Sequence, residues 1–490
     1  MKHAILLLWH KDIGQLEELI ARLNTNFAFY IHLDKKSRLG KEEIRRLKQC
    51  KGVAGVYRKF KTNWGGFNIL KAELFLLKII LKNESVEYIH SMSAQDYPIK
   101  NVRQIEAFFE QNAGNEFISV MKLPDDRWEN STYTRFRYYR PYDCFDFRDR
   151  KGQRIINKVV DFQVRHGIKR RIPDQYDQLY GGSNWFSLTR SCTAYVMQHY
   201  KRSFYRRLKY TFAPEETFFP TVIMNSPFAE KVINDNLRFI VWKKQHSSFP
   251  AILDHTNWAD LMTSSALFAR KFDSVISSQL KSYLDAYVLT EEQVQVDNRG
   301  YWLNNTFAGH CFDPGLGKAI LSVLSYTEVR DIADFGCGPG WYVAFLRKQG
   351  YDVQGYDGNP NVEHLSSLFF PNGFYCQHAD LSEELSTDTP FDMIICLEVG
   401  EHIPVASEET FLDNLANNAG SYILLSWAVQ NQEGDGHVNC RPNRYVIDQL
   451  ADRGFSLNIP ISNYLRSEAS LLWFHKTIMF FQKIPQKNAL

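Results

Sequence analysis

Short apolar runs alternate with amphipathic stretches at the start of the chain, and this order predicts a parallel α/β sheet. Residues 3–9 (HAILLLW) and 27–34 (FAFYIHLD) are apolar runs of strand length. Between them, residues 13–24 (IGQLEELIARLN) repeat apolar positions at three- and four-residue spacing, which is typical of a helix. A longer helix is predicted over 64–83, followed by a strand that runs into a loop over 86–100.

The alternation is interrupted and then restarts. Residues from about 120 to 180 are aromatic, basic and weakly periodic, and a polar, helical passage at 276–299 carries no cofactor signal. The restart consists of a strand, a glycine loop, a helix and further buried strands, at 329–335, 336–340, 341–350, 352–357, 391–398 and 420–428. We therefore expect two α/β domains, 1–275 and 300–490, joined by the 276–299 linker.

Composition narrows the class of protein. The chain has 490 residues, 44% of them hydrophobic and 23% charged, which is ordinary globular composition. A net charge of +3 does not favour nucleic acid as a partner. Its eight cysteines form no C-x-x-C pair, so neither a zinc ribbon nor a disulfide framework is expected. The apolar run Ala4–Leu8 is too short for a signal peptide or a membrane span, which predicts a cytoplasmic protein.

The glycine loop DFGCGPG carries the clearest chemical signal. Gly336, Gly338 and Gly340 follow a strand and precede a helix, where backbone can approach a ligand closely. Asp357 ends the next strand and is placed to accept hydrogen bonds from ribose hydroxyls. The G-x-G-x-G spacing, with Asp334 two residues ahead to receive an ammonium group, favours S-adenosylmethionine over a dinucleotide.

Four motifs in order extend this signal: ADFGCGPG, VQGYDGNP, QHADLSE and FDMIICLEVGEHIP. Through them, the second domain resembles the class I S-adenosylmethionine-dependent methyltransferases, which implies a Rossmann-like fold. The resemblance implies that Asp334 and the three glycines hold the methionine part and Asp357 the ribose. It also implies that Asp380 and Leu381 hold the adenine and that Glu398 lies beside the sulfonium.

Methyl transfer to a hydroxyl needs a base, and imidazole titrates near neutral pH. His402 and His437 are the predicted candidates, although either residue could instead be a helix cap or a packing histidine. Glu401 could orient the His402 ring or, together with it, bind a divalent metal. We therefore assign no residue a metal-binding role.

The first domain carries six further motifs in order: YIHLDKKS, WGGFNILKAELFLL, SMSAQDYPIKN, GGSNWFSLTR, FAPEETFFPTVIMNS and ALFARKFD. Together they resemble the core-2/I-branching β-1,6-N-acetylglucosaminyltransferase and peptide O-xylosyltransferase family. The resemblance implies an inverting glycosyltransferase of the GT-A type that uses a UDP-sugar. It also implies that Glu216 is the catalytic base and that Glu215 replaces an aspartate, although acids at a helix start also suit the helix dipole.

A departing diphosphate needs a positive partner, and the chain contains no Asp-x-Asp metal clamp. Arg270 and Lys271 are expected to replace the ion, unless they are a solvated basic pair. The resemblance places His32 and Asp34 at the uridine side, and Asp96 is expected near the donor sugar. The remaining predictions are Trp64 for the donor pocket and, for the acceptor site, Ser183, Asn184, Trp185 and Trp242.

The predicted function is therefore double: sugar transfer to a glycan or lipid-linked glycan, and O-methylation of that product, in polysaccharide biosynthesis. Residues 243–265 lack an arginine that branching enzymes carry, so the sugar stays open among N-acetylglucosamine, xylose and others. The basic stretches 165–173 and 201–210 predict peripheral contact with the inner membrane face, or else a solvated helix face. The alternatives are two unlinked activities, or one domain that only binds glycan.

Overall fold

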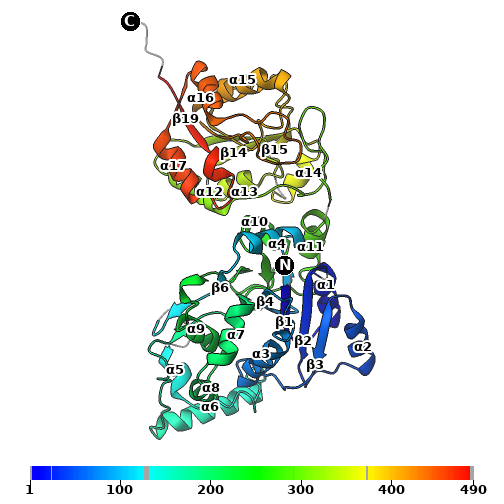
Figure 1. The fold of residues 1–490 in the computed structure, drawn as a ribbon, viewed down its shortest axis with the longest axis vertical. Helices are drawn as coiled ribbons and strands as arrows, with labels where there is room; N and C mark the ends of the chain where they lie inside the picture. The colour runs from blue at the N-terminus through cyan, green and yellow to red at the C-terminus, as the bar shows by residue number, and fades with distance from the viewer. Residues whose placement is uncertain (1–2, 24, 126–131, 291, 371–372, 486–490) are drawn as a thin grey trace. The chain divides into compact units, whose positions relative to one another are not determined.

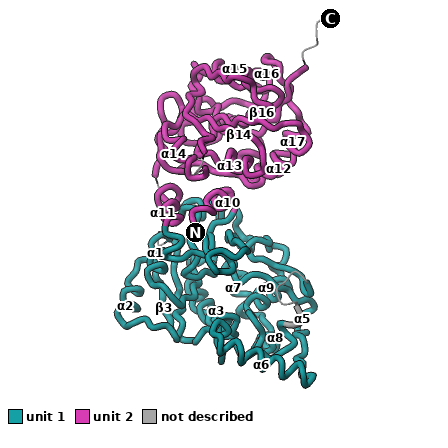
Figure 2. Tube along the Cα trace, turned by 180° about the vertical axis from the view of Figure 1, so that it is seen from behind, with its two compact units in different colours: residues 1–253, 266–278 teal, residues 254–265, 279–490 magenta. Residues whose placement is uncertain are grey.

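The computed structural model describes residues 3–23, 25–125, 132–290, 292–370 and 373–485, which form two compact units (Figures 1 and 2). Unit 1 comprises Met1–Leu253 and Ala266–Ser278, and unit 2 comprises Asp254–Ser265 and Gln279–Leu490. The predicted domain 1–275 and unit 1 differ in two places: the twelve residues Asp254–Ser265 belong to unit 2, and unit 1 extends to Ser278. Most of the predicted linker, from Gln279 onward, is part of unit 2 as well.

Unit 1 is built on a seven-stranded sheet of order β10-β6-β9-β4-β1-β2-β3. Its strands are β1 (His3–Trp9), β2 (Phe27–Leu33), β3 (Val53–Tyr57), β4 (Tyr88–Ser93), β6 (Glu116–Ile118), β9 (Phe186–Thr189) and β10 (Val232–Ile233). A smaller sheet joins β11 (Arg238–Ile240), β12 (Phe268–Arg270) and β5 (Asp96–Pro98). β1 pairs in parallel with both β2 and β4, as the strand–helix–strand pattern predicts.

Alternation along β1 divides the core of unit 1 between two faces, because successive strand side chains point in opposite directions. Leu6 packs in one cluster with Leu77 of α3 (Phe67–Ile80). Ile5 packs in the other cluster with Leu19 of α1 (Ile13–Leu23). The remaining helices include α2 (Lys41–Gln49), α4 (Val102–Gln111), α5 (Thr132–Arg137), α6 (Arg150–Arg165), α7 (Arg190–His199), α8 (Arg202–Leu208) and α9 (Glu215–Met224).

The 16-residue helix α6 lies in the segment where the sequence pattern is weakly periodic. Ile155, Phe162 and Val164 are exposed on it, whereas Ile156 is buried. The buried side of α6 nevertheless carries Ile156 with the half-buried Val159 and Val160 at three- and four-residue spacing, so a helical pattern is present in the sequence, and the sequence interpretation missed it.

Unit 2 is a second seven-stranded sheet, of order β15-β14-β13-β16-β17-β19-β18. Its strands are β13 (Asp331–Phe335), β14 (Asp352–Asp357), β15 (Cys376–His378), β16 (Phe391–Leu397), β17 (Ala419–Ser426), β18 (Phe455–Leu457) and β19 (Met479–Lys483). β19 pairs antiparallel with both of its neighbours, and the other pairs are parallel. Helices α13 (Trp341–Arg347) and α10 (Trp258–Met262) pack against each other in this unit (Figure 2).

No helix in the described part of the chain is long and apolar enough to cross a membrane.

Candidate functional site

The first candidate site lies where β5 meets β12 in unit 1. The two strands are antiparallel with Arg270 opposite Asp96, and Asp96 is fully buried. Arg270 Nη1 lies 3.2 Å from Asp96 Oδ1, and the guanidinium lies 3.9 Å above the ring of Trp185. Three predicted residues are thereby brought together, with the carboxylate of Asp96 orienting the guanidinium over an aromatic face.

Positive charge is concentrated around this pair. Lys271 Nζ donates to Ser248 Oγ at 3.1 Å. Its pKa is lowered first by burial and then by the charges of Arg270, Arg148 and Lys11. The sequence interpretation missed Arg148 and Lys11, because they lie far from the FARKF motif along the chain. Several cations held close enough to lower the pKa of Lys271 form a field that suits a polyphosphate.

The predicted uridine-side residues organise a loop. His32 Nε2 accepts the backbone N–H groups of Lys59 (3.3 Å) and Phe60 (3.0 Å), and burial lowers its pKa to about 4, so the ring is neutral. Asp34 Oδ1 accepts the N–H groups of Lys36 (2.9 Å) and Thr62 (3.2 Å). Both side chains therefore fix the backbone that leads into Trp64.

The predicted aromatic residues are accessible. Trp64 is 43% exposed and lies beneath the guanidinium of Arg148, 5.5 Å from its ring centroid. Trp242 is 61% exposed and its ring lies 5.7 Å from that of Phe249. Exposed indoles at two places in unit 1 are consistent with stacking on a base or a sugar ring.

Glu216 stands in the first turn of α9 and is paired with a buried arginine. Its Oε2 lies 2.7 Å from Arg135 Nη1, and the Arg135 side chain is only 3% exposed whereas that of Glu216 is 28% exposed. Arg135 had no signal in the sequence, since it precedes Glu216 by 81 residues. The ion pair holds the carboxylate in one orientation while part of it remains accessible to an acceptor.

Glu215 differs from its neighbour by being buried. Burial, followed by the charge of Glu216, raises the pKa of Glu215 to about 8. Glu73 of α3 is buried beside it, and burial followed by the charge of Glu215 raises the pKa of Glu73 well above its usual value. At neutral pH, Glu215 therefore holds a proton, and Glu216, paired with Arg135, is the accessible carboxyl group of the helix start.

The predicted acceptor residues lie next to this helix. The Gly182 N–H donates to the backbone carbonyl of Glu216 at 2.9 Å. Ser183 Oγ accepts from Asn236 Nδ2 at 2.9 Å, and the backbone carbonyl of Asn184 accepts from Ser91 Oγ at 2.9 Å. The loop from Ser183 to Trp185 is thus tied both to the helix of Glu216 and, through Trp185, to the cationic residue Arg270.

The second candidate site is a cavity of about 400 Å³ in unit 2. Its walls include His437 and predicted residues from the four motifs: Asp334, Gly336, Gly338, Asp357, Asp380, Leu381, Glu398 and His402. They also include residues that were not predicted: Arg299, Tyr301, Trp302, His310, Trp341 and Trp473. The carboxyl ends of β13, β14, β15 and β16 supply the motif residues, as expected for ligand sites in open α/β sheets.

The loop after β13 can be made only of glycine at its first two predicted positions. Gly336 has φ 79° and Gly338 has φ 52°. A Cβ on Gly336 would lie 2.2 Å from Val399 Cγ2, and a Cβ on Gly338 would lie 2.7 Å from the ring of His310. Gly340 also has a positive φ, 90°, but it does not line the cavity.

Asp334 and Asp357 have different hydrogen-bonding roles in the cavity. Asp357 accepts the N–H groups of Gly338 (2.7 Å) and Asn359 (2.8 Å), so it fixes the loop. Asp334 is 2% exposed, and its Oδ2 has no hydrogen-bond partner among the residues that the structure describes. Burial, then the charge of Asp357, raises the pKa of Asp334 to about 8. A buried carboxylate without a partner suits a ligand ammonium group.

Asp380 and Leu381 form the opposite wall. Asp380 Oδ2 lies 2.8 Å from Arg299 Nη1, and Oδ1 accepts from the N–H and the hydroxyl of Ser382. Leu381 is 5% exposed and so offers an apolar surface. Arg299 was assigned to the linker in the sequence interpretation, and only the structure places it in this wall.

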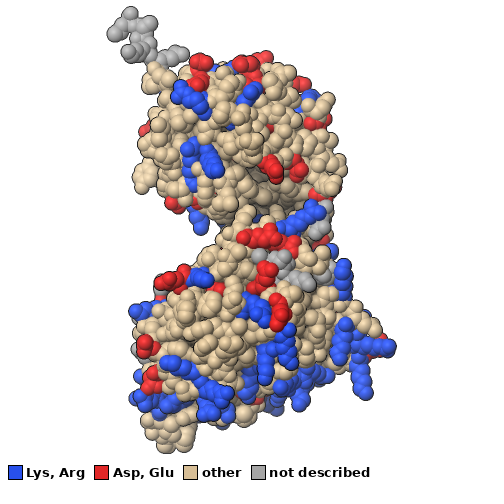
Figure 3. Space-filling view, in the orientation of Figure 1, with Lys and Arg blue, Asp and Glu red and all other residues tan. Residues whose placement is uncertain are grey.

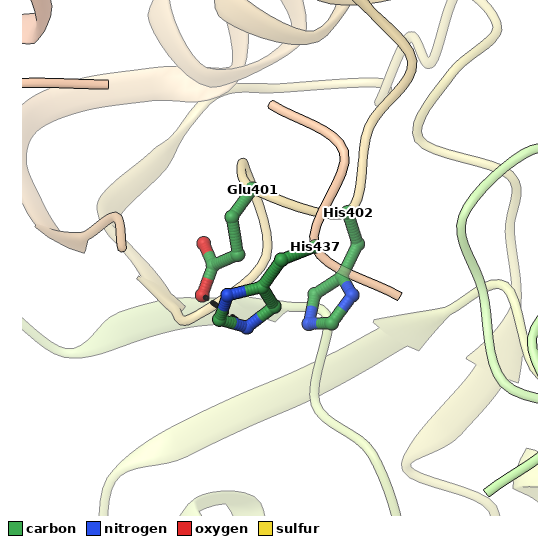
Figure 4. A group of neighbouring side chains, drawn as sticks. All are labelled: Glu401, His402 and His437. Atoms are coloured by element: carbon green, nitrogen blue, oxygen red, sulfur yellow. Dashed lines mark ion pairs between the residues drawn. The ribbon is translucent and has the colours of Figure 1, made fainter. Parts of the chain in front are cut away.

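Glu401, His402 and His437 converge beyond the end of β16 (Figure 4), and Glu398 directly follows the same strand. Glu398 accepts from Gln432 Nε2 at 2.7 Å and from Thr477 Oγ1 at 3.3 Å, and it adopts φ 54°. Burial, then the charge of His437, lowers the pKa of His402 to about 4. Glu398, His402 and His437 line the cavity, whereas Glu401 lies behind it and is fully buried.

Comparison with known proteins matches the two units to different families. A family model for the core-2/I-branching enzymes matches residues 4–259, and a methyltransferase-domain model matches residues 318–429. Similar relatives include xylosyltransferase 2 of Bos taurus, 26% identical over 320 residues (60% of this chain, 34% of that protein). Xylosyltransferase 1 of Canis lupus familiaris is 25% identical over 378 residues (71% of this chain, 36% of that protein). The chain spans about a third of the length of these relatives.

Unit 2 also resembles solved methyltransferase structures at low scores. Magnesium protoporphyrin IX methyltransferase from Synechocystis, with bound SAH, is 19% identical with a TM-score of 0.27 and covers 34% of this chain and 84% of its own. The amino pentose methyltransferase CalS10 from Micromonospora echinaspora, with bound SAM, is 12% identical with a TM-score of 0.28, covering 34% and 89%. The methyltransferase assignment of unit 2 depends instead on its matched family model and its own glycine loop.

Proposed function

We propose, from the premise that this chain belongs to the core-2/I-branching enzyme family, that it is a bifunctional transferase. Unit 1 transfers a sugar from a UDP-sugar to a glycan or lipid-linked glycan, and unit 2 methylates a hydroxyl of that product. The main support for sugar transfer is the loop that contains Trp185. Its Gly182 N–H donates to the carbonyl of Glu216, and the guanidinium of Arg270 lies over the ring of Trp185. A base and a phosphate-binding cation are thereby positioned about one acceptor loop.

The sugar-transfer reaction uses these groups in distinct roles. Glu216 accepts the proton of the acceptor hydroxyl while its oxygen attacks the anomeric carbon from the face opposite to UDP. The bond from that carbon to the diphosphate breaks, and Arg270 and Lys271 neutralise the departing charge without a metal ion. Because the similar relatives are named xylosyltransferases, xylose is the favoured sugar, with N-acetylglucosamine second.

The methyl-transfer half depends on the orphaned carboxylate of Asp334. S-adenosylmethionine supplies an electrophilic methyl group when bound. Asp334 pairs with its ammonium group, Asp357 accepts from the ribose hydroxyls, and Leu381 covers the adenine. His402 and His437 face the same cavity, where one of them would take the proton of the hydroxyl that is methylated.

A labelling experiment tests whether the two activities are linked. The full chain is incubated with a UDP-sugar and a glycan acceptor, and methyl-labelled S-adenosylmethionine is added afterwards. We expect label on the newly added sugar or the acceptor glycan, measured by mass spectrometry after glycan release. A chain that transfers the sugar but labels no glycan would show that the activities are unlinked. Tethering favours the linked version, since the second site meets product at high effective concentration.

A basic face of unit 1 supports contact with anionic lipid and, with it, a lipid-linked acceptor. Lys and Arg side chains gather over α6 and α8 (Figure 3). Arg154, Lys158, Phe162 and Arg165 lie at three- and four-residue spacing along one exposed face of α6. Arg170 is different: it is buried, and donates to the backbone carbonyl of Lys209 at 2.8 Å.

The R154A/K158A double variant should bind anionic vesicles about 30-fold more weakly, because each basic residue near the surface contributes about 1 kcal/mol. Binding is measured by co-sedimentation with phosphatidylserine-containing vesicles at low salt, and binding of the unaltered chain should fall as salt is raised. Lys476→Ala, a change to an exposed lysine of unit 2, is the matched control. Equal binding by the unaltered chain to uncharged vesicles would contradict membrane contact through these charges.

A further inference from the structure

We propose that Glu401, His402 and His437 form a binding site for a divalent first-row transition-metal ion. Each of these residues offers one ligand atom, and the three atoms lie within 4.8 Å of one another. Glu401 Oε1 lies 4.0 Å from His437 Nε2, the pair drawn with a dashed line in Figure 4. Two atoms that are each 2.0–2.2 Å from one ion are at most about 4.4 Å apart, so a small side-chain movement closes the set.

Both imidazoles are held in the tautomer that metal binding requires. His437 Nδ1 lies 3.0 Å from the carbonyl oxygen of Gln432, and His402 Nδ1 lies 3.3 Å from the carbonyl oxygen of Gly436. A carbonyl only accepts, so each Nδ1 carries the proton and each Nε2 keeps its lone pair. Hydrogen bonds of this kind to backbone carbonyls are the usual way in which metal-binding histidines are oriented.

The carboxylate is the second, independent observation. Glu401 is fully buried, and neither of its side-chain oxygens has a hydrogen-bond partner of good geometry among the described residues; the backbone N–H of Ala428 and the carboxyl of Glu398 are polar neighbours. Burying an unpaired carboxylate is costly, and the carboxylate of Glu398 stands close by and adds negative charge. Unlike Glu401, Glu398 is already bonded to Gln432 and Thr477. A cation between Glu401 and the two imidazoles compensates this buried negative charge.

The donor set indicates the class of ion. Two neutral imidazoles and one carboxylate favour Mn²⁺, Fe²⁺, Co²⁺, Ni²⁺ or Zn²⁺ over Mg²⁺ and Ca²⁺, which prefer ligands made only of oxygen. Three protein ligands leave coordination positions open, and the two histidines line the cavity on the same side as Glu398. The open positions therefore face the space where a methyl acceptor would enter.

This placement gives the site a role in acceptor recognition, an inference that rests on the proposed methyl transfer. An ion at this position would bind a pair of adjacent hydroxyl oxygens, which glycans offer and isolated alcohols do not. With the ion bound, His402 and His437 would act as ligands that position the acceptor, and this role replaces the base role given to one of them in the proposed function.

The test measures metal binding directly, on the full chain and without substrate. Protein stripped with EDTA and dialysed is titrated with Mn²⁺ and, separately, with Zn²⁺ in a calorimeter. We expect one equivalent per chain, with affinity lowered at least tenfold in Glu401→Gln and in His437→Ala. His364→Ala, a change to an exposed histidine of the same unit, is the matched control and should bind as the unaltered chain does.

Binding of S-adenosylmethionine is measured on the same samples and separates this inference from the proposed function. Retained cofactor affinity in both variants shows that they are folded, so a loss of metal binding is then specific. No saturable binding of either ion, or binding unchanged in both variants, overturns the site. A chain that binds one equivalent of metal but no S-adenosylmethionine supports the site and counts against the proposed methyl transfer.

Discussion

Glu216→Gln should lower the rate of sugar transfer by about 10²–10⁴-fold, the usual loss when a general base is removed. Glutamine keeps the size of the side chain and can still bond to Arg135, whose Nη1 lies 2.7 Å from the carboxylate. What it loses is the ability to take a proton. The loss should therefore appear in kcat for transfer, with KM for the UDP-sugar changed less than threefold. Initial rates with a UDP-sugar panel measure both constants.

Glu215→Gln is the matched control, because it alters the neighbouring residue of the same helix turn. Burial raises the pKa of Glu215 to about 8, so glutamine replaces a side chain that is already neutral at pH 7. We expect transfer within about threefold of the unaltered chain. Should Glu215→Gln abolish transfer while Glu216→Gln retains it, the buried carboxylate would be the base and our assignment would be wrong.

Asp334→Asn should weaken S-adenosylmethionine binding by about 10²-fold or more, since breaking a buried charge pair costs about 2–5 kcal/mol. Asp334 is buried and its Oδ2 lacks a partner among the described residues, so no neighbouring side chain replaces the lost contact. Calorimetric titration measures the affinity. Asp352→Asn is the control, because Asp352 lies in the same sheet but is exposed and bonds to Arg347.

The pH dependence of binding provides a second readout for Asp334. Its pKa is raised to about 8, and only the ionised carboxylate pairs with an ammonium group, so affinity should rise about tenfold per pH unit between pH 6 and 8. An α-amino group titrates at about 7.7–8.0, and affinity should therefore fall again above pH 8. Asp334→Asn should lose the rising limb. A flat profile for the unaltered chain would contradict the pairing.

The same shift has the opposite effect on the stability of the ligand-free chain. The folded-state pKa of Asp334, about 8, lies above the ordinary value of 3.8, so the folded state binds the proton more tightly. Its contribution to stability is complete below pH 3.8 and is lost as pH rises toward 8. The ligand should therefore raise the melting temperature most near pH 8, where the unpaired charge destabilises the free protein.

Regular elements that pack on one side were predictable, and irregular ones were not. β1, α1, β2 and β13 coincide with their apolar runs, because each buries a continuous or one-sided set of side chains. α6 was missed although Ile156, Val159 and Val160 recur at helical spacing, because exposed apolar and basic residues are interspersed with them along the chain. The membership of Asp254–Ser265 in unit 2 was missed for another reason: which unit buries a segment depends on tertiary packing and leaves no local signal.

In the candidate sites too, some residues could be predicted from the sequence and others could not. The sequence identified residues within motifs, such as Asp334 and Glu216, because their neighbours in the chain share the motif. Their partners are distant: Arg135 precedes Glu216 by 81 residues, and Arg299 precedes Asp380 by a similar stretch. No spacing rule connects residues so far apart, and only the fold brings them together.

The path of the chain has a consequence for dissecting this protein. It passes between the two units at Leu253, at Ser265 and again at Ser278. Trp258, Leu261 and Met262, all buried in unit 2, precede Arg270 and Lys271, which complete unit 1. Any single cut therefore removes residues from one of the two units. A fragment that ends at 253 lacks Arg270 and Lys271 of unit 1, and a fragment that begins at 279 lacks Trp258 of unit 2. The two units alternate along the chain, so no single truncation separates them into two complete pieces.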